Sequence, residues 1–276
     1  MAPGPTKPYL SLPRPWLVAH RGGATLAPEN TLAAFDEGVR HGAVCLELDV
    51  RLTRDGVVVV SHDDDTTRVT SMPGTIEQRT LTEVERLDAG CRYSRDGGRT
   101  FPFRARALRI PTLREVLLAY PELRLNIDAK TRDAALAEAL VAVIRGARAV
   151  GRVCVGSAHD DQGERLRAIL PEACHFLPRH AAARHLLAAR AGGLLEWICP
   201  GGWDVAAVPA RAGAITLIDA GVVRRLHARG LAVFVWTIDD EDEMRSLIAM
   251  GVDGVMTDRP DRLARVLAGD RASRAR

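Results

Sequence analysis

Lysine is almost missing from this chain of 276 residues, because only two of its 38 basic residues, Lys7 and Lys130, are lysines. The net charge is only +3, and no basic stripe interleaved with aromatic residues is evident, so we expect no nucleic-acid partner. Lysine presents a compact ammonium where arginine presents a planar guanidinium. Lys130, the one lysine outside the N-terminal segment, is therefore a candidate for a site that needs a compact charge, with chance placement as the alternative.

Sequence signals for disulfides, zinc and membranes are also lacking. No stretch approaches the roughly 20 apolar residues of a membrane helix, and the first fifteen residues hold no apolar run long enough for a signal peptide. We therefore predict no transmembrane segment. The cysteines are odd in number and have no CxxC spacing, which is typical of reduced, small hydrophobic residues in a cytoplasmic protein. They are Cys45, Cys91, Cys154, Cys174 and Cys199.

Alternation of short β-branched runs with longer amphipathic segments predicts an α/β fold, and apolar residues make up 47% of the chain, enough for a large core. About eight strand–helix units imply a parallel sheet closed into a (β/α)8 TIM barrel. Strands are expected at 16–19, 43–49, 57–61, 123–129, 153–157, 173–177, 195–199, 214–218, 231–237 and 252–256. Helices are expected at 31–41, 113–120, 132–150, 160–170, 181–191, 220–229, 241–250 and 260–268.

The domain boundaries follow from breaks in this rhythm. Five prolines among residues 1–15 predict an extended N-terminal arm, and residues 16–268 form the predicted barrel domain. Residues 63–111 are too long for an ordinary connection and predict a small insertion or lid after strand two. The Arg-rich residues 269–276 predict a frayed basic tail.

Polar residues gather where the predicted strands end. Active sites of TIM barrels lie at the carboxyl ends of the strands, so this clustering predicts a catalytic site there. Residues two apart on one strand project to the same face. The candidates are His20, Arg21, Glu47, Asp49, His62, Asp128, Lys130 and Trp236.

Three of the candidates are carboxylates on apolar strands, Glu47, Asp49 and Asp128. Burying such groups is costly without a partner, and oxygen ligands favour a hard cation, so we expect one Mg²⁺ or Ca²⁺ ion. The alternative is that Glu47 and Asp49 form ion pairs with arginines at a solvated edge. No histidine pair has the spacing of a zinc site.

The two histidines at strand ends, His20 and His62, are candidates for proton transfer, because imidazole titrates near neutral pH. Asp63 either orients His62 or stabilises a turn, and Asp258 is expected to cap the last helix. Trp236 is either a pocket wall or part of the barrel core.

Six blocks in order make the chain resemble the glycerophosphodiester phosphodiesterase family, whose fold is a TIM barrel like that of phosphatidylinositol phosphodiesterases. The blocks are AHRGGATLAPENTLAAF, LELDVRLTRDGVVVVSHDDDTTRVT, IPTLREVL, LNIDAK, VFVWTIDD and GVDGVMTDRPD. The resemblance implies divalent-metal-dependent hydrolysis of a glycerophosphodiester to sn-glycerol 3-phosphate and an alcohol. It also implies roles for the candidate residues.

By this resemblance, His20 and His62 are the catalytic pair, with His20 as base and His62 as acid. Glu47, Asp49 and Asp128 are the metal carboxylates, Arg21 and Lys130 contact phosphate, and Trp236 lines the cleft. Two positions depart from the family pattern: Asp128 replaces the usual glutamate, which is one methylene longer, and Asp239 replaces the usual asparagine. The first departure requires the ion to shift toward the strand of Asp128 or to admit a water.

The resemblance leaves three functions open. The first is the hydrolysis just described, by a metal-activated water or by the glycerol 2-hydroxyl. The second is a lysophospholipase D or sphingomyelinase D activity, in which Tyr93, Phe101 and Phe103 of residues 63–111 would cover an acyl chain. The third is a non-catalytic barrel that binds polyol phosphates. Oligomeric state is not readable from the sequence.

Overall fold

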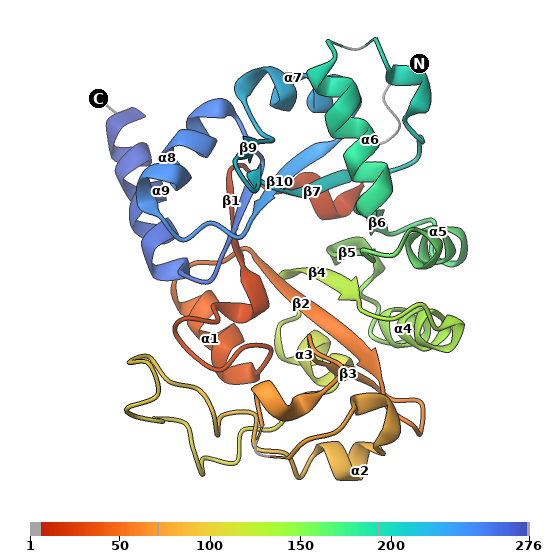
Figure 1. The fold of residues 1–276 in the computed structure, drawn as a ribbon, viewed down its shortest axis with the longest axis vertical. Helices are drawn as coiled ribbons and strands as arrows, with labels where there is room; N and C mark the ends of the chain where they lie inside the picture. The colour runs from red at the N-terminus through yellow and green to blue at the C-terminus, as the bar shows by residue number, and fades with distance from the viewer. Residues whose placement is uncertain (1–6, 71, 193, 275–276) are drawn as a thin grey trace.

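Eight parallel strands form the centre of the protein, seen in a computed structural model that describes residues 7–70, 72–192 and 194–274 (Figure 1). Their spatial order is β6-β5-β4-β2-β1-β11-β10-β7, and a parallel bridge between Phe176 and Val205 brings β6 to β7. The ring is therefore nearly closed, which confirms the predicted TIM barrel. The strands are β1 (Trp16–Ala19), β2 (Cys45–Leu52), β4 (Arg124–Ala129), β5 (Val153–Gly156), β6 (Cys174–His175), β7 (Val205–Pro209), β10 (Ala232–Trp236) and β11 (Gly254–Thr257).

A helix follows each barrel strand, and Figure 1 shows these helices arranged around the strands. Several begin at a side chain that accepts a backbone N–H, as Thr31 does from Ala34 and Asp219 from Val222. No helix within the described ranges is both long enough and apolar enough to cross a bilayer. The helices are α1 (Leu32–Arg40), α3 (Leu113–Ala119), α4 (Ala134–Gly146), α5 (Asp160–Ile169), α6 (Arg179–Arg190), α7 (Ala220–Ala228), α8 (Glu241–Met250) and α9 (Pro260–Arg274).

The strands divide their side chains between two apolar clusters. On β2, Leu46 and Leu48 belong to the large cluster between strands and helices, whereas Cys45 belongs to a smaller one that also holds Trp16 and Phe234. Because side chains alternate along a strand, Glu47 and Asp49 share the face of Cys45, inside the barrel. The site carboxylates therefore project from the inner wall.

The segment before β1 differs from the predicted extended arm. Pro8–Ser11 forms a 3-10 helix, η1, and Tyr9 is 1% exposed. The Tyr9 ring packs edge-on against Trp16 with ring centroids 5.3 Å apart, and its hydroxyl lies 3.3 Å from Cys45 Sγ. The aromatic ring is more stable in this apolar hollow at the amino end of the barrel than in water, because its burial removes apolar surface from solvent. Residues 1–6 of the predicted arm lie outside the described residues.

The C-terminal segment also differs from the prediction, because α9 continues to Arg274 where a frayed tail was expected from residue 269. Residues 275–276 lie outside the described residues. The five cysteines form no disulfide.

Three of the predicted strands do not belong to the barrel ring. Residues 195–199 contain a 3-10 turn, η6 (Glu196–Ile198), and the barrel strand at this point is β7, which the alanines of its sequence VAAVP concealed. Residues 214–218 belong to an exposed hairpin of β8 (Arg211–Ala212) and β9 (Ile215–Thr216). The expected strand 57–61 is β3 (Val58–Val60), which pairs antiparallel with β2 and stays outside the ring.

The predicted insertion after strand two is present between β3 and α3. It contains η3 (Thr66–Arg68), η4 (Ile76–Gln78) and the short helix α2 (Leu81–Val84). A small apolar cluster that includes Val59, Ile76 and Ile110 holds it together. The two remaining short turns are η2 (His20–Gly22), after β1, and η5 (Val150–Arg152), before β5.

Two histidines outside the set of candidates are buried, and His175 is the less exposed of the two. His175 on β6 is 1% exposed, and its Nδ1 and Nε2 lie 3.1 and 2.8 Å from the carbonyl oxygens of Val155 and Leu170. Burial lowers the pKa of His175 below its usual value and outweighs these two carbonyls, which favour the protonated ring.

We predict that His175 makes the protein less stable in acid. The unfolded chain binds a proton near pH 6.5 and the folded chain only at lower pH, so the free energy of unfolding falls as pH falls through this window, by at most about 1.4 kcal/mol per pH unit. Urea unfolding at about pH 7.5 and about pH 5.5 measures this loss. The loss should be smaller in His175→Gln, since all other titrating groups are shared. Equal losses in both proteins would disprove the role of His175.

Candidate active site

Carboxylates of β2 and β4 form the inner wall of the site. The parallel register pairs Asp49 with Asp128, so the two carboxylates lie side by side at the carboxyl ends of their strands. Glu47 is 8% and Asp49 2% exposed. Burial and the neighbouring Asp49 charge raise the pKa of Glu47 to about 7. The site therefore concentrates negative charge where water is largely excluded.

Two cations balance this charge. The Lys130 ammonium lies 3.3 Å from Asp49 Oδ1 and 3.0 Å from Asp128 Oδ2, and Arg21 Nε lies 3.3 Å from Asp49 Oδ2. These cations hold the pKa of Asp49 below its usual value even though burial alone would raise it. Asn30, which has a positive φ of 58°, donates from Nδ2 to Asp49 Oδ2 at 2.9 Å.

The turn η2 places His20 and Arg21 beside Glu47. Arg21 has a left-handed backbone, with φ 48°, and its N–H donates to Glu47 Oε2 at 3.0 Å. Gly22 follows with φ 88°, and a Cβ there would lie 2.6 Å from the Ala34 carbonyl carbon. Only glycine lets the turn approach α1 this closely.

His20 is held by an aspartate from the last strand end. Its Nδ1 lies 2.7 Å from Asp258 Oδ1, and its Nε2 lies 3.9 Å from Glu47 Oε2. Burial opposes protonation, but the Glu47 charge and the Asp258 hydrogen bond outweigh it and raise the pKa of His20 to about 8. Asp239 in turn accepts from the Asp258 N–H and the Thr257 hydroxyl, at 2.9 and 2.8 Å.

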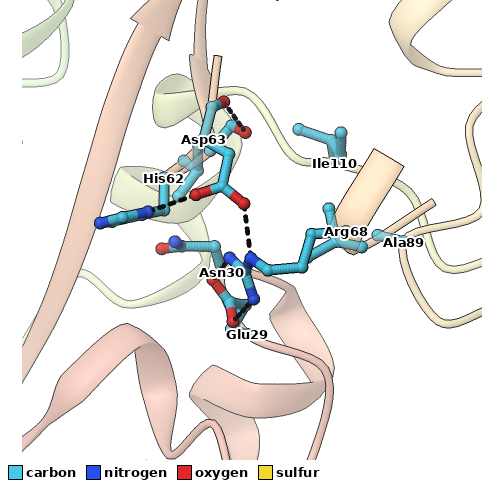
Figure 2. Close-up of a pocket in the computed structure, with 10 residues that line it drawn as sticks. Glu29, Asn30, His62, Asp63, Arg68, Ala89 and Ile110 are labelled. Atoms are coloured by element: carbon cyan, nitrogen blue, oxygen red, sulfur yellow. Dashed lines mark hydrogen bonds and ion pairs between the residues drawn. The ribbon is translucent and has the colours of Figure 1, made fainter. Parts of the chain in front are cut away.

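His62 has an equivalent aspartate partner. Its Nδ1 lies 2.7 Å from Asp63 Oδ1, and Figure 2 shows the ring extending away from Arg68, which binds the other Asp63 oxygen at 2.5 Å. Arg68 also donates to both Glu29 oxygens at 2.7 Å. Beside His62 lies a hollow of about 10 Å³, enough for about one water molecule.

A chain of ion pairs therefore connects the two halves of the site. The Glu29 carboxylate forms an ion pair with Arg68 on one side and with Arg21 Nη1, at 2.8 Å, on the other. Since Arg21 also contacts Asp49, the orientation of His62 and the charge of the carboxylate wall depend on one connected network.

The carboxylate oxygens of the three predicted metal ligands are of the type that a hard cation such as Mg²⁺ or Ca²⁺ prefers. Asp128 Oδ1 is buried and has no hydrogen-bond partner in the described residues, and all three predicted ligands offer oxygens. As their side chains lie, however, no three His, Cys, Asp or Glu groups of residues 7–70, 72–192 and 194–274 are gathered closely enough to hold an ion. Lys130 accounts for this, because its ammonium contacts both Asp49 and Asp128.

Trp236 ends β10, and its side chain is 41% exposed. This exposure excludes the alternative that it belongs to the barrel core. It leaves Trp236 at the same rim as the other candidates, available as a wall of the cleft.

Comparisons with known proteins identify the family of this chain. A model of the glycerophosphoryl diester phosphodiesterase family matches residues 20–262. The chain belongs to this family. It is an enzyme of the phosphodiesterase class, as the sequence predicted.

Individual relatives extend the comparison. A probable glycerophosphodiester phosphodiesterase 2 of Mycobacterium tuberculosis is 33% identical over 91% of this chain and 89% of its own length. A human lysophospholipase D is 28% identical over 89% of this chain and 84% of its own.

Two solved structures are similar over nearly their whole length. A glycerophosphoryl diester phosphodiesterase domain from M. tuberculosis has a TM-score of 0.81 at 24% identity, covering 93% of this chain and all of that one. An Oleispira antarctica phosphodiesterase in complex with the product sn-glycerol-3-phosphate has a TM-score of 0.69 at 26% identity, covering 92% and 97%.

Sequence reasoning missed several residues of this network. Asp258 was expected to cap α9 but holds His20, and Asn30, which was not among the candidates, holds Asp49. Glu29 and Arg68 carried no signal, because each is one of many scattered charges whose partner lies far along the chain.

We predict that Asp258 is a positioning residue for His20. Asp258→Asn should lower kcat by roughly a hundredfold while KM changes little, because the aspartate fixes the ring without touching substrate. Steady-state kinetics on glycerophosphocholine would measure both.

Asp239→Asn is the matched control, because its amide oxygen still accepts from Thr257 and Asp258; about a threefold loss or less is expected. Equal losses in both variants, or a loss of Asp258→Asn confined to KM, would contradict the assignment.

Proposed function

We propose that this enzyme hydrolyses glycerophosphodiesters to sn-glycerol 3-phosphate and an alcohol, using a divalent cation and two histidines. The observation that carries the proposal is the pair of aspartate-held histidines, His20 and His62, at the rim of one buried carboxylate wall. The family and the product complex of the Oleispira relative support the same substrate class.

Glu47, Asp49 and Asp128 are the residues that would hold the cation, Mg²⁺ or Ca²⁺. When bound there, it would act as a Lewis acid that polarises the phosphoryl oxygen and offsets negative charge. This assignment is supported by Asp128 Oδ1, which has no hydrogen-bond partner among the residues described, and by the buried Glu47 carboxylate. Since aspartate is one methylene shorter than glutamate, an ion held by Asp128 would lie closer to β4 or would admit a water molecule.

The histidines transfer the two protons. Each has its Nδ1 beside an aspartate, so Nε2 is the nitrogen that takes or gives a proton, and in His20 this atom lies 3.9 Å from Glu47 Oε2. Following the family resemblance, His20 accepts the proton of the attacking hydroxyl, from water or the glycerol 2-hydroxyl, and His62 protonates the departing alkoxide. Asp63 and Asp258 fix the rings in the required orientation.

Arg21 and Lys130 stabilise the charge of the phosphodiester as it grows in the transition state. Both lie on the carboxylates in this structure, Arg21 on Glu29 and Asp49, and Lys130 on Asp49 and Asp128. Substrate phosphate would share them with these carboxylates. Trp236 at the rim of β10 would pack against the glycerol or the head group.

Lysophospholipase D activity is the second candidate, favoured by the similarity to the human enzyme of that name. Tyr93 and Phe103 of the insertion stack edge-on with ring centroids 5.3 Å apart, and Phe101 and Phe103 are half-buried.

Membership of an enzyme family and the paired histidines argue against a non-catalytic barrel. A cytoplasmic location stays a prediction from the cysteines.

We predict that activity depends on a divalent cation and on His20. EDTA should abolish release of sn-glycerol 3-phosphate from glycerophosphocholine, and added Mg²⁺ or Ca²⁺ should restore it. His20→Ala should lose at least about a thousandfold in kcat, because one proton transfer is lost. Full turnover in EDTA would overturn the metal assignment, and an active His20→Ala would overturn that of His20.

We predict that glycerophosphocholine is cleaved at least about tenfold faster, in kcat/KM, than lysophosphatidylcholine. The aromatic rings of the insertion offer few open apolar faces, because guanidinium groups lie over them. A paired assay of the two substrates by head-group release decides the matter. A preference for the lysolipid would make the enzyme a lysophospholipase D.

A further inference from the structure

An arginine-rich loop projects from the insertion beside the active-site mouth. Residues 92–109 contain six arginines and a single acidic residue, Asp96, for a net charge of +5, which exceeds the +3 of the whole chain. Figure 1 shows this stretch, in yellow, extending away from the ring of strands beside α1. Here basic and aromatic residues do alternate, contrary to the expectation from the sequence.

The positive charge of this loop is not compensated. Arg109 pairs with Glu85 and Glu115, but in the part of the chain that the structure describes the other five arginines form no ion pair. Three of them donate to backbone carbonyls, which hold a side chain without cancelling its charge. Arg92 binds the Thr70 carbonyl, Arg95 that of Leu26, and Arg104 that of Cys91.

The loop is fixed next to the site. Tyr93 donates its hydroxyl hydrogen to the Thr25 carbonyl, and Arg95 binds the next residue, Leu26. Both acceptors lie in the connection between η2, which carries His20 and Arg21, and α1. The loop therefore belongs to the same end of the barrel as the site, and whatever it binds is brought to the mouth.

The arrangement of the arginines favours an extended surface over a small ligand. None of the six lines the hollow beside His62, and they are spread over 18 residues of the sequence, at positions 92, 95, 99, 104, 106 and 109. A flat array of charge attracts a flat array of opposite charge, and basic residues near an anionic bilayer each strengthen binding about fivefold.

The rings of the loop argue against a nucleic acid. Single strands bind by stacking bases on open aromatic faces. Here guanidinium groups lie over these rings: Arg104 is 3.7 Å from the Phe101 ring centroid, and Arg106 is 5.3 Å from that of Phe103. We propose that residues 92–109 are a docking surface for anionic lipid bilayers, which holds the catalytic mouth against the membrane.

The test is co-sedimentation of the full-length enzyme with vesicles of phosphatidylcholine alone or with added phosphatidylglycerol. The test variant is Arg99→Gln/Arg106→Gln, since both side chains are exposed and neither makes a hydrogen bond. The matched control is Arg224→Gln/Arg225→Gln on α7, where both side chains are exposed and the same charge is removed at the other end of the molecule (Figure 1).

We expect binding only to the anionic vesicles, weakened about 25-fold in the loop variant and unchanged in the control. Salt at about 1 M, where the Debye length is about 3 Å, should release the wild type. Equal binding to both vesicle types, no binding to either, or an undiminished loop variant would overturn the proposal. So would binding of a single-stranded oligonucleotide in preference to anionic vesicles. Since binding is measured without turnover, a failure of the proposed catalytic function would not affect this result.

Discussion

The charge balance around Asp49 is the constraint on which the mouth of the barrel depends. This carboxylate is 2% exposed and meets Asn30, Arg21 and Lys130, which come from the segment before α1, from η2 and from the end of β4. A buried charge that loses its partner costs several kcal/mol. Moving any one of these three segments away would therefore remove a partner from the buried Asp49 charge, and this cost holds the segments together.

This balance extends beyond the carboxylate wall. Arg21 contacts Asp49 with one nitrogen and Glu29 with another, and Glu29 binds Arg68, which fixes Asp63 beside His62. A substrate phosphate that draws Arg21 toward itself would weaken its hold on Glu29. Substrate binding and the orientation of His62 would thereby be coupled through side chains.

The sequence predicted the barrel and the polar strand ends because both follow local rules of alternation and placement. It failed where the deciding partner lies far along the chain. Tyr9 looked like part of a proline-rich arm, since nothing nearby in sequence reveals the hollow formed with Cys45. Asp258 looked like a helix cap because its partner, His20, lies 238 residues away.

Strand β7 was missed for a different reason. Its sequence is dominated by alanine and valine, and alanine has little preference for strands, whereas residues 195–199 imitated a strand with tryptophan and isoleucine, which are common in strands. Closure of the ring decides the position of β7, since its Val205 carbonyl accepts the Leu177 N–H at 2.8 Å. Closure of the ring depends on all eight strands, so it cannot be predicted from the sequence of one segment.

The anchoring of η1 has a consequence for the order in which the chain folds. Arg124, the first residue of β4, donates to the carbonyl of Tyr9, and Lys7 reaches the carbonyl of Pro171. During synthesis Tyr9 therefore lacks Arg124 until β4 has followed, and Lys7 lacks Pro171 until more than half of the barrel has followed. Contacts of such long sequence separation form late, because their loop entropy must be overcome first. The amino end of the barrel, where Tyr9 packs, is therefore expected to be among the last parts to form, and until then Tyr9 is exposed to solvent and to other chains.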